Sequence, residues 1–145
     1  MSLRWTLGLA GALLLSATPA LAQERIVALG GAATEILYAL GEEGRLVGVD
    51  TTSTYPPEAA ALPSVGYFRQ IGAEGVLSLL PDLVLAVEGT GPTQALDLIE
   101  RSGVPVVWIP GEPTVAGVTE RIAAVAHAVG AEAAGRRLTA EVDAR

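Results

Sequence analysis

The chain has 145 residues, contains no cysteine and carries a formal net charge of −7, from nine basic and sixteen acidic residues. A chain this acidic, without a basic run, is poorly suited to nucleic-acid backbones, which are bound by clusters of lysine and arginine. We therefore expect no nucleic-acid partner, and we expect stability to come from a packed core rather than from disulfide bonds.

Residues 1–22 have the pattern of a secretory signal peptide. Arg4 precedes an almost unbroken run of apolar and small residues over 5–17, and Ala20-Leu21-Ala22 forms a small-residue cleavage site. The apolar run is shorter than a membrane span, which needs about 20 residues. We predict export to the periplasm and a processed chain that begins at Gln23.

The processed chain opens with signals for a strand, a turn and a helix. Residues 25–29 form a short apolar run before Gly30-Gly31, which predicts a buried strand that ends in a turn. Helical spacing over residues 34–40, followed by Gly41, predicts a helix that stops at this glycine. Glu35 then lies in the first turn, where we interpret it as a capping residue.

The next segment contains the residue pair of greatest chemical interest. Residues 46–49 predict a second strand, and residues 50–63 form a long connection without a clear period, a type that is usually functional or mobile. If the following segment, 65–70, is extended, Tyr67 and Arg69 lie on the same side of it. The guanidinium would favour the ionised phenol, which is an oxygen ligand for ferric iron. Because Tyr-x-Arg is a common sequence, these residues alone favour an ordinary tyrosine at a loop rim.

The rest of the chain continues the alternation of helix and strand. Helix, strand, helix, strand and helix are predicted in turn over residues 73–80, 82–87, 92–102, 104–109 and 114–129. Leu80 is expected on the inner face of the first of these helices and Val115 on that of the last. Such alternation predicts an α/β fold with a mainly parallel sheet. Residues 131–145 predict a further helix without a stop signal, so we interpret the sequence as the amino-terminal part of a longer protein.

Two features of the sequence have ordinary structural interpretations. His127, the one histidine, lies roughly 200° around its helix from the apolar Val125, so we expect it on the surface. A zinc or manganese site would need several converging ligands. Gly30-Gly31 with Asp50 resembles a dinucleotide-binding fingerprint, but the G-x-G-x-x-G order is missing and a tight turn explains the glycines. The sequence offers no combination of serine, histidine and acidic residues that would indicate a hydrolase.

Several motifs occur together, in order and with consistent spacing. They are Arg25-Ile-Val-Ala-Leu-Gly, Thr34-Glu-Ile-Leu-Tyr-Ala-Leu-Gly, Arg45-Leu-Val-Gly-Val-Asp, Tyr55-Pro-Pro, Ala73-Glu-Gly-Val-Leu-Ser-Leu-Leu-Pro-Asp-Leu-Val-Leu-Ala and Gly103-Val-Pro-Val-Val. Together they resemble the helical-backbone periplasmic binding proteins, which serve ABC importers of haem, ferric siderophores and cobalamin. Leu62-Pro-Ser-Val-Gly-Tyr-Phe-Arg-Gln followed by Ala73-Glu-Gly is most similar to the haem-binding branch.

The resemblance implies a Rossmann-like, parallel-sheet lobe over residues 23–130 and the start of the inter-lobe backbone helix over residues 131–145. It also implies that Tyr67 is the axial haem ligand with Arg69 beside it. In that family a glutamate at the position of Glu74 docks onto arginines of the permease; capping of its helix is an equally weighted alternative.

Further side chains are candidates for the ligand cleft. Glu88 belongs to a loop at the carboxyl end of a predicted strand, where ligands bind in open α/β sheets, although an ordinary loop explains it equally well. The aromatic residues Tyr55, Phe68 and Trp108 could stack on a porphyrin. Core or cleft-wall packing is the alternative for Trp108, and a loop anchor is the alternative for Tyr55.

We therefore expect a monomeric periplasmic protein, not an enzyme, that binds haem and delivers it to an ABC permease of the inner membrane. A ferric-siderophore or cobalamin carrier of the same fold is the alternative within the family. An alternative of another class is a Rossmann-like oxidoreductase domain, which the export signal and the missing glycine disfavour.

Overall fold

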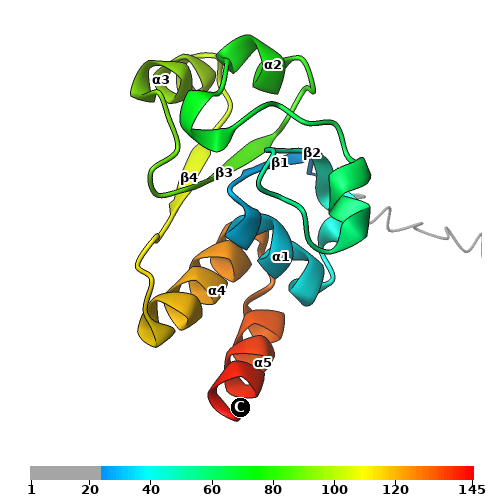
Figure 1. The fold of residues 1–145 in the computed structure, drawn as a ribbon, viewed down its shortest axis with the longest axis vertical. Helices are drawn as coiled ribbons and strands as arrows, with labels where there is room; N and C mark the ends of the chain where they lie inside the picture. Colours follow the sequence, from blue (N-terminus) through cyan, green and yellow to red (C-terminus); the bar gives the residue numbers. More distant parts are fainter. Residues whose placement is uncertain (1–23) are drawn as a thin grey trace, which may run out of the picture.

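A four-stranded parallel sheet forms the centre of the protein (Figure 1). The structure is a computed structural model that describes residues 24–145, so the predicted signal peptide lies outside the described residues. The strands are β1 (Ile26–Leu29), β2 (Leu46–Val49), β3 (Leu83–Val87) and β4 (Val106–Ile109), in the spatial order β2-β1-β3-β4. The predicted α/β fold with a parallel sheet is confirmed, and each predicted strand is present.

Helices cover both faces of the sheet. They are α1 (Gly31–Leu40), α2 (Ala73–Leu77), α3 (Thr93–Arg101), α4 (Val115–Val129) and α5 (Glu132–Asp143), with short 3-10 helices η1 (Glu43–Arg45), η2 (Pro57–Ala61) and η3 (Phe68–Gln70). Figure 1 shows α2 and α3 on one face, α1 and α4 on the other, and α5 continuing beyond α4. Among the described residues, no helix has the length and apolar character needed to cross a membrane.

The two faces of the sheet have separate hydrophobic cores because strand side chains alternate in direction. In β1, Ile26 and Ala28 pack with residues of α1 and α4, whereas Val27 and Leu29 pack with residues of α2 and α3. All four side chains are completely buried. A strand covered on both faces reads as a continuous apolar run, which is the pattern of residues 26–29.

The carboxyl edge of the sheet contains a topological switch point between β1 and β3. These neighbouring strands are followed by α1 and α3, which lie on opposite faces of the sheet (Figure 1). In open α/β sheets, ligands usually bind outside the carboxyl ends of the strands at such a point. The fold therefore directs attention to the loops that follow β1, β2 and β3.

Helix α1 begins earlier than the sequence predicts. Gly30 is its N-cap, with φ of 106°, and no acidic residue lies in its first turn. The prediction that Glu35 caps this helix is therefore wrong, because Gly31 already belongs to the helix. Thr34, predicted at the helix start, is instead buried inside it, and its hydroxyl lies 2.7 Å from that of Ser53.

Two apolar residues predicted to face inward are exposed. Leu80 is 74% exposed, because α2 ends at Leu77 and Leu80 has φ of 51°. Pro81 disfavours helical backbone at the residue before it, and the side chain of Arg25 donates hydrogen bonds to the carbonyls of Leu79 and Leu80 at 2.8 and 3.0 Å. Val115 is 77% exposed, because it opens α4 and the buried side of this helix begins at Gly117.

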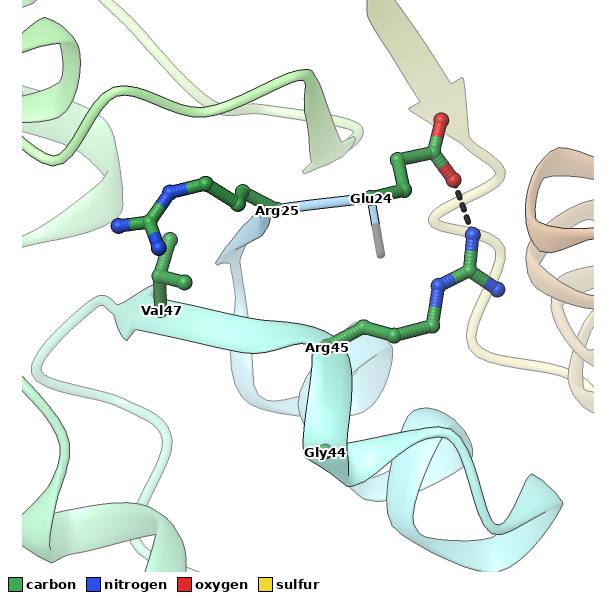
Figure 2. Close-up of a pocket in the computed structure, with 5 residues that line it drawn as sticks. All are labelled: Glu24, Arg25, Gly44, Arg45 and Val47. Carbon is green, nitrogen blue, oxygen red and sulfur yellow. Dashed lines mark hydrogen bonds and ion pairs between the residues drawn. The ribbon is translucent and has the colours of Figure 1, made fainter. Parts of the chain in front are cut away.

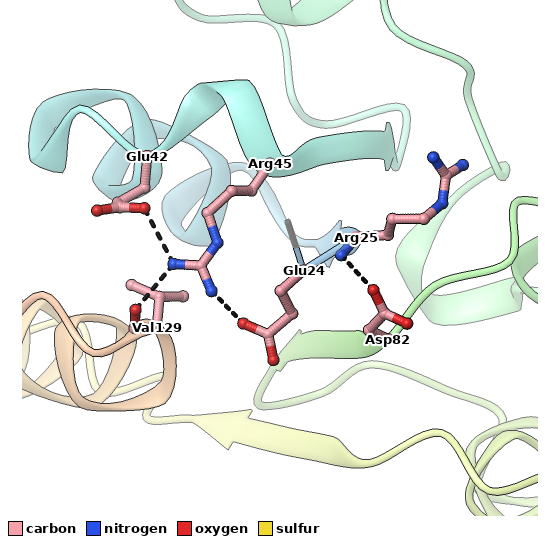
Figure 3. A network of polar contacts seen from close by, with 6 residues as sticks. All are labelled: Glu24, Arg25, Glu42, Arg45, Asp82 and Val129. Carbon is pink, nitrogen blue, oxygen red and sulfur yellow. Dashed lines mark hydrogen bonds and ion pairs between the residues drawn. The ribbon is translucent and has the colours of Figure 1, made fainter. Parts of the chain in front are cut away.

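Arg45 joins three segments at the amino edge of the sheet (Figure 3). Its guanidinium forms ion pairs with Glu24 and Glu42 and donates a 2.8 Å hydrogen bond to the carbonyl of Val129, in the last turn of α4. A polar cavity of about 230 Å³ adjoins Arg45. Figure 2 shows the residues around it. The cavity is lined by Glu24, Arg25, Gly44, Arg45 and Val47.

Candidate functional site

The segment that carries Tyr67 is attached to the end of β2. The backbone N–H of Val65 donates to the carbonyl of Val49, and that of Thr51 donates to the carbonyl of Gly66, each at 2.9 Å. Gly66 has φ of 95°, a conformation that suits glycine. The residue that precedes Tyr67 is therefore fixed beside the carboxyl end of β2.

The same segment is attached to the loop after β3. The backbone N–H of Gly91 donates to the carbonyl of Phe68 at 2.9 Å, and that of Ile71 donates to the carbonyl of Gly91 at 3.0 Å. Residues 65–71 thus run across the carboxyl edge of the sheet, from β2 to β3. Tyr67 lies between these two attachments, at the edge where the fold predicts a ligand and opposite to the cavity at the amino edge.

The Tyr67 side chain is 42% exposed. Its hydroxyl makes no hydrogen bond to any residue in the described range 24–145, whereas its ring meets the Phe68 ring edge-on, with centroids 5.2 Å apart and planes at 83°. Aromatic pairs of this geometry stabilise each other by about 1 kcal/mol beyond their burial. The ring therefore packs against Phe68, while the residue as a whole stays partly exposed.

Tyr67 and Arg69 are not related in the way that an extended segment predicts. Tyr67 itself is extended, but Phe68–Gln70 form η3, and the N–H of Gln70 donates to the carbonyl of Tyr67 at 2.8 Å. The Arg69 guanidinium carbon lies 5.2 Å from the centroid of the Phe68 ring. Phe68 therefore contacts both neighbours, and the extended arrangement predicted for residues 68–70 is wrong because the chain turns there.

The loop after β3 lies against Arg69. A Cβ atom placed on Gly89 would be 3.7 Å from Nη2 of Arg69, an ordinary van der Waals contact, so the guanidinium lies directly beside this loop. The Glu88 carboxylate accepts a 3.1 Å hydrogen bond from the N–H of Gly111, at the end of the adjacent strand. The structure thus brings Arg69 and residues 88–91 together at one edge, a contact that sequence spacing does not reveal.

The other candidate residues lie outside this group of contacts. Tyr55 is exposed in the connection after β2, and the side chain of Trp108 is about half exposed on β4. Glu74 is exposed in the first turn of α2. His127 is exposed on α4 as predicted, with Nδ1 3.3 Å from a carboxylate oxygen of Glu132.

No cluster of possible metal ligands accompanies these residues. Within residues 24–145, no group of three or more His, Cys, Asp or Glu side chains is arranged to hold a metal ion.

Sequence reasoning missed the role of Asp50. This residue is 1% exposed, and its carboxylate accepts hydrogen bonds from the N–H groups of Gly30 and Thr52 at 2.9 and 3.0 Å. Because the carboxylate is committed to the backbone, it is not free to bind a ribose. The interpretation of Gly30-Gly31 as a tight turn is consistent with these contacts. The sequence did contain a signal for this role, because Asp50 is a charged residue directly after a buried strand.

Residues 26–145 match the family model described as "Periplasmic binding protein". Among solved structures, the periplasmic heme-binding protein RhuT from Roseiflexus sp. RS-1, in apo form, is 45% identical with a TM-score of 0.81, over 83% of this chain and 46% of that one. The heme-binding protein HutB of Vibrio cholerae is 38% identical with a TM-score of 0.78, over 84% of this chain and 47% of that one.

A curated relative from Yersinia pestis (strain Pestoides F) has the name "Vitamin B12-binding protein". It is 38% identical over 96 residues, which are 66% of this chain and 34% of the relative. The chain thus spans about a third of this curated relative and less than half of the two similar structures.

Proposed function

Because this chain belongs to the periplasmic binding protein family, we propose that the full-length protein binds haem in the periplasm and delivers it to an ABC permease. The observation that carries this proposal is Tyr67, which is 42% exposed and whose hydroxyl has no hydrogen-bond partner among the described residues, on a segment fixed at both ends. The heme-binding relatives described above support the choice of ligand.

Tyr67 is proposed as the axial ligand of the haem iron. A phenolate oxygen is a known axial ligand of ferric haem. Arg69 also contacts the Phe68 ring and adds a positive charge near the site. Tyr55 and Glu88 are proposed to line the cleft around the porphyrin. Capture of this kind needs binding and release, and no covalent bond within the ligand is made or broken.

The proposed site has two walls. Residues 23–130 are proposed as the amino-terminal lobe, and residues 131–145, which include α5, as the start of a helix that leads to a second lobe. A flat porphyrin has two apolar faces, and both must be covered for tight binding. This lobe alone is therefore expected to bind haem weakly. Glu74 is proposed to dock onto the permease.

Cobalamin is the second candidate ligand, because the curated relatives are named for vitamin B12 binding. The two ligands make different demands on Tyr67. Haem would use its oxygen as an axial iron ligand, whereas the cobalt of cyanocobalamin already has both axial positions filled, by its own benzimidazole and by cyanide. A ferric siderophore remains a third option of the same fold.

The decisive experiment is the absorption and resonance Raman spectrum of the full-length protein with ferric haem. We expect the signature of a high-spin, tyrosinate-ligated iron. Tyr67→Phe, which keeps the ring contact with Phe68, should abolish this signature, while Tyr38→Phe, away from the site, should leave it intact. An unchanged spectrum in Tyr67→Phe would remove Tyr67 from the proposal. Tighter binding of cyanocobalamin than of haem to the wild-type protein would favour the second candidate.

A further inference from the structure

The Asp50 carboxylate is the centre of a buried polar group at the carboxyl end of β2. Oδ1 accepts hydrogen bonds from the N–H of Gly30 at 2.9 Å and from the hydroxyl of Ser53 at 3.1 Å. Oδ2 accepts from the N–H and the hydroxyl of Thr52 at 3.0 and 2.8 Å. Thr34 extends the group, since its hydroxyl lies 2.7 Å from that of Ser53. Ser53 and Thr34 are both buried.

This arrangement requires a carboxylate. Each oxygen of Asp50 faces a backbone N–H, from Gly30 on one side and Thr52 on the other, and a backbone donor cannot turn into an acceptor. An asparagine has one acceptor and one donor end. In either orientation, its amide group would point a donor at a backbone donor. An uncharged residue of the same shape therefore cannot replace Asp50 without losing one of these contacts.

The Asp50 turn is connected directly to Tyr67. Thr51 lies between Asp50 and Thr52, whose N–H the carboxylate accepts, and the N–H of Thr51 donates to the carbonyl of Gly66 at 2.9 Å. Gly66 is the residue before Tyr67. Asp50 thus holds the first residues of the connection that follows β2, and through Thr51 it also holds Gly66, beyond the end of this connection.

We propose that Asp50 is a positioning residue for Tyr67. Its carboxylate ties the turn at Thr51 and Thr52 to Gly30, at the end of β1, and this turn sets the place of Gly66 and of the phenol that follows. The inference rests on the proposed function, because the consequence of correct placement is an iron–phenolate bond of defined geometry. Asp50 itself touches neither iron nor porphyrin in this account.

The test compares Asp50→Asn with Asp82→Asn in the full-length protein. Asp82 is a matched control, since its carboxylate also accepts a backbone N–H from a distant residue, that of Arg25 at 2.7 Å, but at the amino edge of the sheet. We expect Asp50→Asn to weaken ferric haem binding by about 10- to 100-fold, the usual effect of removing groups that orient metal ligands. The phenolate-to-iron band should shift or weaken. Asp82→Asn should keep both the wild-type affinity and the band.

Amide hydrogen exchange in the ligand-free protein supplies a readout that does not depend on haem. Exchange at Thr51 and Val65 should be faster in Asp50→Asn than in the wild type, and unchanged in Asp82→Asn. If Asp50→Asn does not fold, Thr52→Ala removes the hydroxyl that connects Asp50 with the N–H of Gly31. Because Thr52 is exposed, we expect Thr52→Ala to speed exchange at Thr51 and Val65 less than Asp50→Asn does.

The possible outcomes distinguish the proposed haem-binding function from the positioning role of Asp50. Wild-type protein without any iron–phenolate signature would overturn the proposed function, whatever Asp50 does. Wild-type affinity and band in Asp50→Asn, even with lowered stability, would overturn the positioning role and leave Tyr67 as the ligand. Unchanged exchange at Thr51 and Val65 in Asp50→Asn would overturn it as well, because the turn would then be held by other contacts.

Discussion

The Phe68 ring contacts both side chains of chemical interest: its centroid lies 5.2 Å from that of the Tyr67 ring and 5.2 Å from the Arg69 guanidinium carbon. The carbonyl of Phe68 is in turn held by the N–H of Gly91. Phenol and guanidinium therefore have their positions set by a common apolar neighbour and by the loop after β3, rather than by a direct contact with each other.

The first prediction concerns Arg69. Arg69→Ala should weaken ferric haem binding by about tenfold, since a charge next to a metal ligand acts as an outer-shell group, while the iron–phenolate signature of Tyr67 persists. Titration with ferric haem, followed by its absorption spectrum, measures both quantities. Arg101→Ala removes an exposed arginine at the end of α3 and is the control. Complete loss of the signature would mean that Arg69 is needed for ligation itself.

The second prediction concerns Glu74. Glu74→Arg should reduce the ATP hydrolysis that the loaded protein stimulates in its reconstituted permease, because a reversed charge would repel the basic socket proposed there. Haem affinity should not change. Glu100→Arg, a charge reversal at an exposed position of α3, is the control. A loss of haem affinity in Glu74→Arg would place this residue in the cleft instead.

The third prediction concerns Gly30, whose backbone has φ of 106°. A Cβ atom at this position would lie 2.7 Å from Cγ2 of Val87, so alanine adds a steric clash to an unfavourable backbone. Gly30→Ala should lower the free energy of unfolding by about 2–4 kcal/mol. Gly41→Ala has the backbone cost without the clash, since nothing lies within 4 Å of its Cβ, and should cost about 1 kcal/mol. Urea unfolding measures the free energy of unfolding of both variants. Equal losses of stability in the two variants would contradict the clash at Gly30.

The fourth prediction concerns Tyr38 on α1. Desolvation by burial, followed by the negative charges of Glu58 and Glu43, raises the pKa of this phenol above its ordinary value of 10.0. The folded state therefore favours the protonated phenol, and the resulting stability is fully present below pH 10 and is lost as the pH rises through the raised pKa. Thermal unfolding across this range should show a steeper alkaline loss in wild type than in Tyr38→Phe. Parallel curves would contradict the shift.

The fifth prediction concerns Arg45, which donates hydrogen bonds to acceptors in three segments. Arg45→Ala should lower the free energy of unfolding by about 2–3 kcal/mol, because the carbonyl of Val129 and two carboxylates lose a charged donor. Arg45→Lys should restore only part of this stability, since an ammonium group lacks the planar fork that reaches several acceptors. Full rescue by lysine would show that charge alone matters.

The sequence predicts the strands well because each is a short apolar run between turn residues. Leu46–Val49 is placed with its observed bounds, and Ile26–Leu29 and Leu83–Val87 begin one residue later than predicted. Helix starts are less certain. Helical spacing over residues 34–40 does not reveal that Gly30 provides the N-cap, because that role depends on the contact between its N–H and Asp50, twenty residues away.

The site is predicted only in part, for the same reason. Tyr67 and residues 88–91 are recognisable as loop residues near strand ends. Their proximity depends on the hydrogen bond between Phe68 and Gly91, and the direction of Arg69 depends on η3, a short turn without a clear sequence pattern. Contacts between segments, rather than the preferences of single residues, determine both features.

The hydrogen bond between Arg45 and Val129 has a consequence for the order of folding. Its two residues are 84 positions apart, and contacts of such separation form only after the intervening chain has been organised. In a chain that emerges amino terminus first, β1 and β2 are available long before the last turn of α4. Until α4 has formed, the apolar strand faces that it later covers are exposed, and transiently exposed surface of this kind is prone to aggregation.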